Sequence, residues 1–310
     1  MIVLSAVFFI IFRKTASPPV MKANTASRTA QYMALFRALE TNRPSGKRLF
    51  TDPYAVSFLT AGFKFVTQLS VIPFIRNLVY GIIRKRIPGA LSSGVARTRY
   101  IDELLQQAVR NGVKQVIILG AGYDTRALRL GFLRALPVIE IDHPDTARLK
   151  QERVKRSLGR LPENVRYIQT DFNERSLDQL AAEQQIDKTQ ATVFIWEGVT
   201  NYLTADAVAA TFAFMQQFAR GSYVIFTYVD EKIIRYPAAF FGGEKLLEDL
   251  KQIEEHWTFG LEPFLTRRYL DSFDMDLLED YSAGEYRNHY LPERSEKGYE
   301  FYRVAFAVKR

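Results

Sequence analysis

Acidic side chains close three successive apolar segments of this chain. If the segments are parallel strands, their carboxylates lie along the sheet edge where ligands of open α/β folds bind. A carboxylate at such an edge can accept hydrogen bonds from both hydroxyls of a ribose, or hold a cationic amino group. The acids are Asp142, Asp171 and Glu197, which end the runs 136–142, 165–171 and 193–197.

The surroundings of each acid suggest what it binds. Glu140 lies two residues before Asp142, so on a strand both face the same side, and Asp142 is nearer the ligand edge. Asp171 precedes Phe172, a pair that can hold an adenine amino group and cover its ring, although Asp171 could also cap a helix. Glu197 could hold a cationic group of a ligand, such as the α-amino group of a cofactor that contains methionine.

A glycine turn precedes these acids. The apolar run 116–119 ends in Gly120-Ala121-Gly122 and enters a helical pattern, which predicts a buried strand, a tight turn and a helix capped by Asp124. A dinucleotide fingerprint requires a third glycine, but Thr125 occupies that position. We therefore favour a ribose-bearing cofactor without a diphosphate, S-adenosylmethionine. A dinucleotide, or a turn without a ligand, remains open.

These residues need a sheet to position them. Alternating strand and helix patterns predict an α/β fold, a Rossmann-like sheet with helices on both faces. We expect the strands to be 116–119, 136–142, 165–172, 193–199, 224–229, 275–281 and 300–308, the last two in a closing antiparallel hairpin. We expect a tail at 1–24, a helical cap at 25–110 and a core at 111–310, with a lid insertion at about 230–270.

The chain resembles the leucine carboxyl methyltransferase-like group of class I S-adenosylmethionine-dependent methyltransferases, and its bacterial branch in particular. The similarity extends over most of the chain from about residue 25 onward. The residues that carry it are Arg37-Ala38-Leu39-Glu40, Leu49 to Ala55, Ala96 to Asp102, Gly120 to Arg126, Glu140 to Pro144, Asp171-Phe172 and Trp196 to Leu203.

The resemblance implies a role for each site residue. Arg97 would pair with the cofactor's methionine carboxylate, and Gly120, Ala121 and Gly122 would pass under its methionine part. Asp142 would hold the ribose, Asp171 and Phe172 the adenine, and Glu197 the amino group. Arg99 would point almost opposite to Arg97 on a helix, so we expect it to be structural.

The resemblance also implies the reaction, methyl transfer from a sulfonium by in-line displacement. A carboxylate acceptor needs no general base, and none of His143, His256 and His289 has a clear claim to that role. We therefore expect O-methylation of a carboxylate or acidic hydroxyl, on a small molecule or a protein C-terminus. Tyr202 could position the acceptor or simply pack over the strand end.

Two other functions stay open. Tyr228 and Lys232 have the spacing of the short-chain dehydrogenase pair, which would suit an NAD(P)-dependent oxidoreductase, but that pair needs a helix. The chain could also be an inactive cofactor-binding module or a membrane-tethered one.

The amino-acid composition limits which metals, ligands and surfaces the chain could bind. The 310 residues are 47% hydrophobic, carry a net charge of +8 and include no cysteine, which excludes disulfides and thiolate metal sites. The three histidines are too widely spaced for a metal site. The positive charge could favour an acidic substrate or an anionic surface, and we find no nucleic-acid motif. The oligomeric state is not predicted.

The first residues allow two interpretations. Met1 to Phe12 is apolar and precedes Arg13-Lys14, but a helix of that length spans about 18 Å, short of the about 30 Å of a bilayer core. It is either a short membrane-touching anchor or lies upstream of a start at Met21, and we expect a cytoplasmic protein. The basic-apolar stretch from Phe63 to Ile87 is expected to be a substrate cap, or a membrane contact.

Overall fold

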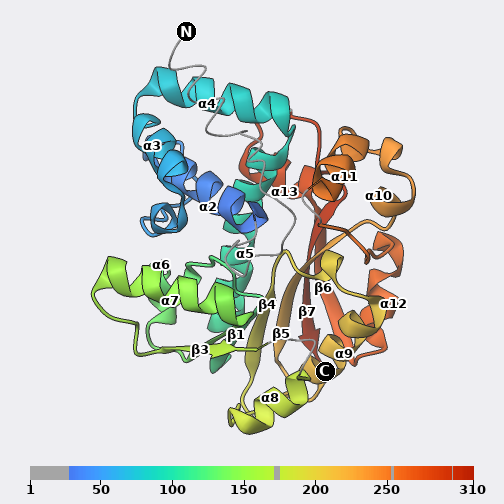
Figure 1. Cartoon of the computed structure of the whole chain (residues 1–310). Coiled ribbons are helices and arrows are strands. Elements are labelled where there is room, and N and C mark those ends of the chain that lie inside the picture. The colour runs from blue at the N-terminus through green and yellow to red at the C-terminus, as the bar shows by residue number, and fades with distance from the viewer. Residues whose placement is uncertain (1–27, 171–174, 253–254, 295) are drawn as a thin grey trace.

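The computed structural model of this protein describes residues 28–170, 175–252, 255–294 and 296–310. A seven-stranded sheet with the order β3-β2-β1-β4-β5-β7-β6 forms its centre (Figure 1). The strands are β1 Gln115–Leu119, β2 Val138–Asp142, β3 Val165–Gln169, β4 Thr192–Trp196, β5 Tyr223–Val229, β6 Met275–Ser282 and β7 Tyr302–Lys309.

Strands β1 to β5 are parallel, and β7 runs antiparallel to both β5 and β6. The carboxyl ends of β1 to β5 therefore lie at one edge of the sheet, as predicted from the acids at the strand ends. The predicted α/β fold is confirmed. The final two strands pair with each other as expected, and β7 inserts between β5 and β6.

Helices cover both faces of the sheet (Figure 1). The described helices are α2 Arg28–Thr41, α3 Ala61–Leu69, α4 Pro73–Arg86, α5 Ala90–Arg110, α6 Arg126–Arg129, α7 Pro144–Leu158, α8 Leu177–Glu183, α9 Ala205–Gln216, α10 Lys232–Arg235, α11 Gly243–Lys251, α12 Thr266–Asp271 and α13 Ala283–Tyr290.

Two hydrophobic cores separate these layers. Along β1, Val116 and Ile118 face a core shared with α2, α5 and α13, while Ile117 and Leu119 face a core shared with α8, α9 and α12. This alternation is the period of two expected of a strand buried on both faces. Helix α5 packs across β4, β5 and β7, which brings its side chains to the centre of the sheet.

A helix follows the glycine turn as predicted, but it is short and its N-cap is not the predicted residue. Helix α6 has a single turn, and the chain becomes extended at Leu130 before a 3-10 turn that begins at Gly131. Asp124 does accept a hydrogen bond from the backbone N–H of Arg126, 2.6 Å away, but the N-cap residue is Thr125. The longer helix α7 follows the next strand, with Pro144 in its first turn and left-handed Gly159 at its end.

The segment 230–270 contains α10, α11 and α12, and Leu270 of α12 is buried in the second core. The division into tail, cap, core and lid remains a prediction. Among the described residues, no helix has both the length and the apolar character needed to cross a bilayer.

Candidate cofactor-binding site

The glycine turn follows β1 and lies against the end of β2, where the backbone N–H of Gly120 donates to the carbonyl of Ile141 at 2.9 Å. The φ angles of Gly120 and Gly122 are +63° and +47°, in the left-handed region that favours glycine. A Cβ atom on Gly120 would lie 2.5 Å from Cγ2 of Val199, whereas one on Gly122 would meet no heavy atom of the described residues closer than 3.9 Å. The first glycine is therefore explained by close packing against the loop after β4, and no such packing against the described residues explains the second.

Asp142, the last residue of β2, lies against this turn. Its carboxylate accepts hydrogen bonds from the backbone N–H groups of Gly122 and, at 2.6 Å, His143. Burial raises the pKa of Asp142, and these two hydrogen bonds oppose that effect. Because each carboxylate oxygen can accept more than one hydrogen bond, the side chain could still accept ribose hydroxyls.

Glu140 belongs to a different environment. Its carboxylate forms an ion pair with Lys150 of α7 at 2.6 Å, and both side chains are buried. Burial raises the pKa of Glu140 to about 7, against the opposing effect of the lysine. Of the two carboxylates near the end of β2, only Asp142 contacts the turn.

Glu197 follows β4 and is held by two arginines. Its oxygens lie 2.8 Å from Nε of Arg97, on α5, and 2.9 Å from Nη1 of Arg126. Burial would raise the pKa of Glu197, but Arg126 and Arg97 outweigh it, so the pKa is lowered and the carboxylate is ionised at neutral pH. The two groups assigned to the amino and carboxylate ends of the methionine part thus form an ion pair with each other.

Arg97 is buried at 8% exposure and lies over the ring of Tyr302, 4.7 Å from its centroid. Arg99, two residues along α5, is directed elsewhere and pairs with Glu103 at 2.6 Å near the surface. The expectation that the two arginines point in different directions is confirmed.

A buried network of charges supports this centre, and the sequence interpretation assigned none of its members except Asp124, which it expected to cap a helix. Arg126 also contacts Asp124, and its Nε lies 2.9 Å from Asp102 of α5. Arg129 pairs with the same Asp102 at 2.6 Å. Arg126 holds the pKa of Asp124 down to about 2 despite burial. The network connects α5, the glycine turn and Glu197 in one set of contacts.

Asp52 forms the other half of this network. It accepts hydrogen bonds from Nε of Arg37 at 2.9 Å and from the hydroxyl of Thr125 at 2.6 Å. Arg37 in turn donates to the backbone carbonyl of Tyr123 at 2.6 Å. Thr125, at the position of the absent third glycine, therefore anchors the turn to the N-terminal helices. Arg37, Asp52, Asp102 and Arg126 lie in sequence blocks that carried the family resemblance, which was the available signal.

Tyr202 lies in a short 3-10 turn, Thr200–Tyr202, beyond Glu197. Its hydroxyl donates a hydrogen bond to Glu255 at 3.0 Å, and burial raises its pKa well above the ordinary value. It is therefore protonated at neutral pH, so it can donate a hydrogen bond but cannot act as a base. Its role toward an acceptor remains a prediction. Asp171 and Phe172, assigned to the adenine, lie outside the described residues.

The oxidoreductase pair does not form on a helix. Tyr228 lies in β5 and donates to Asp280 at 2.6 Å, whereas Lys232 begins α10. His143 is the N-cap residue of α7. No group of acids and histidines within the described ranges could hold a metal ion.

Solved structures share this fold. A structure titled "putative methyltransferase" from Thermobifida fusca superposes with a TM-score of 0.56 at 17% identity, covering 88% of this chain and 97% of the other. A DUF574 family protein from Streptomyces avermitilis gives the same TM-score at 14% identity, with 88% and 100% coverage. At these identities the similarity shows the fold, that of class I methyltransferases.

The sequence profile of the leucine carboxyl methyltransferase family matches residues 30–216, more than half of the chain. The chain belongs to this family. A Mycobacteroides abscessus protein is 31% identical over 244 residues, 74% of this chain and 78% of that protein. A Frankia alni protein is 37% identical over 185 residues, but that match spans 58% of this chain and 60% of the relative's length.

Both relatives are named "Putative S-adenosyl-L-methionine-dependent methyltransferase". The predicted family is confirmed. The predicted enzyme class, a methyltransferase, and the predicted cofactor, S-adenosylmethionine, are the ones given in the relatives' names. Nothing in the family or in these names supports the oxidoreductase alternative.

Proposed function

We propose that this chain is an S-adenosylmethionine-dependent O-methyltransferase whose acceptor is a carboxylate or an acidic hydroxyl, on a small molecule or a protein C-terminus. One observation carries the proposal. Asp142 ends β2 and Glu197 follows β4, the two strands that flank β1, and Asp142 accepts a hydrogen bond from Gly122 in the glycine turn that follows β1.

The side chains present fit this cofactor. Its amino-acid end carries both a carboxylate and an ammonium group, and Arg97 and Glu197 already form the complementary pair at 2.8 Å. Binding would replace one ion pair with two charge-assisted contacts in a buried setting, where such contacts are strong. Asp142 would accept the ribose hydroxyls, as its position at the turn allows.

S-adenosylmethionine supplies an activated methyl group on a sulfonium, so the protein mainly aligns the acceptor oxygen and excludes water. Tyr202 stays protonated and does not act as a base; its one O–H donates to Glu255, so a hydrogen bond to an acceptor oxygen would have to replace that contact. A carboxylate acceptor is already ionised at neutral pH and needs no base. This supports the carboxylate over a neutral alcohol.

The chemistry of the product tests the proposal. The full chain is incubated with cell extract and donor carrying a labelled methyl group, with Glu197→Gln as the reduced-activity control. A methyl ester releases labelled methanol in mild alkali, whereas a methyl ether or an N-methyl group keeps its label. Alkali-labile product is expected, and mass spectrometry then separates small molecules from protein C-termini.

The other outcomes have distinct meanings. Alkali-stable label would refute the carboxylate acceptor. Mass spectrometry would then separate a methyl ether, which supports the acidic hydroxyl, from an N-methyl product, which refutes O-methylation. Absence of label above the control, together with tight binding of the cofactor by calorimetry, would show an inactive binding module. Binding of NAD without binding of S-adenosylmethionine would refute the enzyme class.

A further inference from the structure

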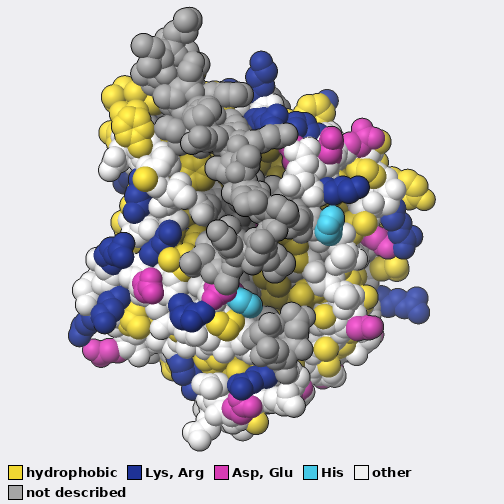
Figure 2. Space-filling model, in the orientation of Figure 1, with side chains coloured by type: hydrophobic (Ala, Val, Ile, Leu, Met, Phe, Trp, Pro, Cys, Tyr) yellow, Lys and Arg dark blue, Asp and Glu magenta, His cyan; other side chains and the backbone are white. Residues whose placement is uncertain are grey.

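Four large apolar side chains are exposed where α3 turns into α4. Phe65 is 49% exposed, Val71 62%, Ile72 51% and Phe74 76%. We call these four residues the α3–α4 corner. Hydrophobic side chains gather at this outer part of the molecule, near the start of α4 (Figures 1 and 2). Contiguous exposed apolar surface of this kind marks a site of interaction with a partner or a membrane.

Packing of the cap does not account for these residues. The same two helices bury Val66, Val79 and Ile83 in the first core, and they pack against α2 and α5. Ile72 is the N-cap residue of α4, a position where its side chain makes no capping hydrogen bond. The apolar character of the corner therefore serves neither the core nor the helix start.

The outward face of α4 is apolar at one end and basic at the other. Lys85 follows Phe74 by eleven residues, which places the two side chains within about 20° of each other and about 16 Å apart along the axis. Leu78, only partly buried, lies on the same side, about 40° from Phe74. Lys85 is exposed, between Arg84 and Arg86. This is the pattern of a helix lying in a membrane interface.

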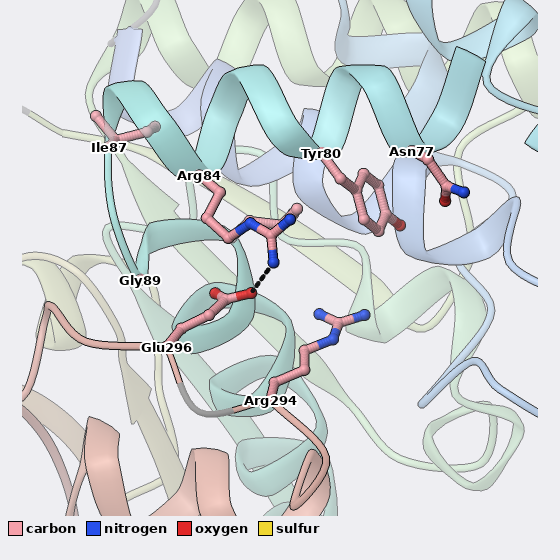
Figure 3. Close-up of a pocket in the computed structure, with 8 residues that line it drawn as sticks. Asn77, Tyr80, Arg84, Ile87, Gly89, Arg294 and Glu296 are labelled. Atoms are coloured by element: carbon pink, nitrogen blue, oxygen red, sulfur yellow. Dashed lines mark ion pairs between the residues drawn. The ribbon is translucent and has the colours of Figure 1, made fainter. Parts of the chain in front are cut away.

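A pocket fixes which side of α4 faces the protein. A cavity of about 160 Å³ lies between α4 and the start of α5. Tyr80 and Arg84 point from α4 toward Glu296 and Arg294 in this cavity (Figure 3). Glu296 lies 3.9 Å from Arg84 and accepts a hydrogen bond from Ser92 at 2.5 Å. Around the helix, Tyr80 lies about 120° and Arg84 about 80° from Phe74, so Phe74 lies on a different side of α4 from these two pocket residues.

The basic residues of α3 and α4 favour an anionic binding partner at this surface. Residues 53–101 contain no aspartate or glutamate, and the part that forms α3 and α4 contains five basic residues: Lys64, Arg76, Arg84, Lys85 and Arg86. A positively charged surface next to exposed aromatic and branched side chains complements anionic lipid headgroups above an apolar interior. Residues 1–14 repeat this composition in sequence, twelve residues nearly all apolar followed by Arg13-Lys14.

We infer that the α3–α4 corner and the basic end of α4 form a docking surface for a membrane that contains anionic lipids. The apolar corner enters the interface and Lys85, which is exposed, contacts the headgroups. The contact is peripheral, and it is independent of the methyl-transfer proposal because it uses none of the cofactor residues.

Vesicle co-sedimentation of the full chain tests this inference. Vesicles of phosphatidylcholine with phosphatidylglycerol should bind the protein, and added salt should weaken binding, since it screens the basic residues. The double variant Ile72→Ser/Phe74→Ser should bind at least about tenfold more weakly, because two apolar side chains no longer leave water. Serine is a favourable N-cap residue, so α4 should keep its fold, which circular dichroism checks.

Phe264→Ser is the matched control, since Phe264 is 74% exposed but lies in the turn Pro263–Leu265, outside α3 and α4. It should bind vesicles like the wild type. Lys85→Glu should lower binding to the anionic vesicles. Absence of wild-type binding, equal binding by the double variant, or an equal loss in Phe264→Ser would overturn the inference. So would self-association through the corner without vesicles, which would show a second copy as its occupant.

Discussion

Glu197→Gln tests the centre of the site, because this carboxylate neutralises two buried arginines. The substitution keeps the shape of the side chain and removes its charge. Breaking a buried ion pair by removing one partner costs about 3–5 kcal/mol of stability. In the variant, Arg126 still has its ion pairs with Asp102 and Asp124. Arg97 retains only weak contacts among those described, with the Tyr302 ring and the Met33 sulfur. We therefore expect a loss near the lower end, about 3 kcal/mol.

The effect should depend on pH. The pKa of Glu197 is lowered in the folded protein, so its stabilisation is present above the ordinary value of 4.5 and is lost as the pH falls through the folded-state value. The free energies of unfolding in urea of the wild type and of Glu197→Gln should therefore differ most at neutral pH and less in acid. Calorimetry should show roughly 10- to 150-fold weaker binding of S-adenosylmethionine, the loss of one charge-assisted hydrogen bond.

Glu183→Gln is a suitable control. Glu183 pairs with Arg175 at 2.9 Å, the same distance as Glu197 to Arg126, but both side chains are about half exposed. Its loss should cost less than about 1 kcal/mol and leave cofactor binding unchanged. If Glu197→Gln unfolds within about 1 kcal/mol of the wild type, the account of a neutralising carboxylate is wrong. Normal affinity in the folded variant would remove Glu197 from the cofactor site.

Three further changes probe the turn and the sheet. Asp142→Ala should weaken S-adenosylmethionine binding roughly 10- to 150-fold by calorimetry, and unchanged affinity would mean that another residue holds the ribose. Gly120→Ala should destabilise the fold more than Gly159→Ala in urea unfolding, since both glycines have positive φ but only the first would also meet Val199; equal losses would contradict that. The pKa of Glu140 is raised to about 7, so its contribution to stability should be present below the ordinary value of 4.5 and lost as the pH rises through about 7. Glu140→Gln should lack this dependence when urea unfolding is compared at about pH 5 and about pH 8, and an unchanged profile would assign the titration to another group.

The charge network also connects the N-terminal helices to the glycine turn. Asp52 lies in the connection between α2 and α3, yet it holds Thr125 at 2.6 Å, immediately before α6. Arg37 of α2 donates to the backbone of the same turn. Changes at either residue should therefore act on the cofactor turn as well as on the packing of α2.

Local patterns predicted the sheet well. Apolar runs, glycines and acids at strand ends depend on backbone geometry within a few residues, so strands β1, β2, β4 and β5 lie within a few residues of their expected positions. The cap of the helix after the glycine turn was predicted wrongly, because the N-cap residue is Thr125 and not Asp124. Asp124 instead contacts the side chain of Arg126, and Thr125 is held by Asp52 from a distant part of the chain, which local sequence does not show.

The sequence alone determined the class of fold, the glycine turn and the acids beside it, because strand alternation and turn chemistry are local properties. Only the tertiary structure decided the partners of those acids. Arg97 and Glu197 are one hundred residues apart in sequence, and Arg126 meets Asp102 from another element. Two carboxylates near the end of β2 look alike in sequence, yet one is paired inside the sheet layer and the other lies at the turn. Burial and pairing are set by which helices pack against the sheet, and that depends on contacts between distant parts of the chain.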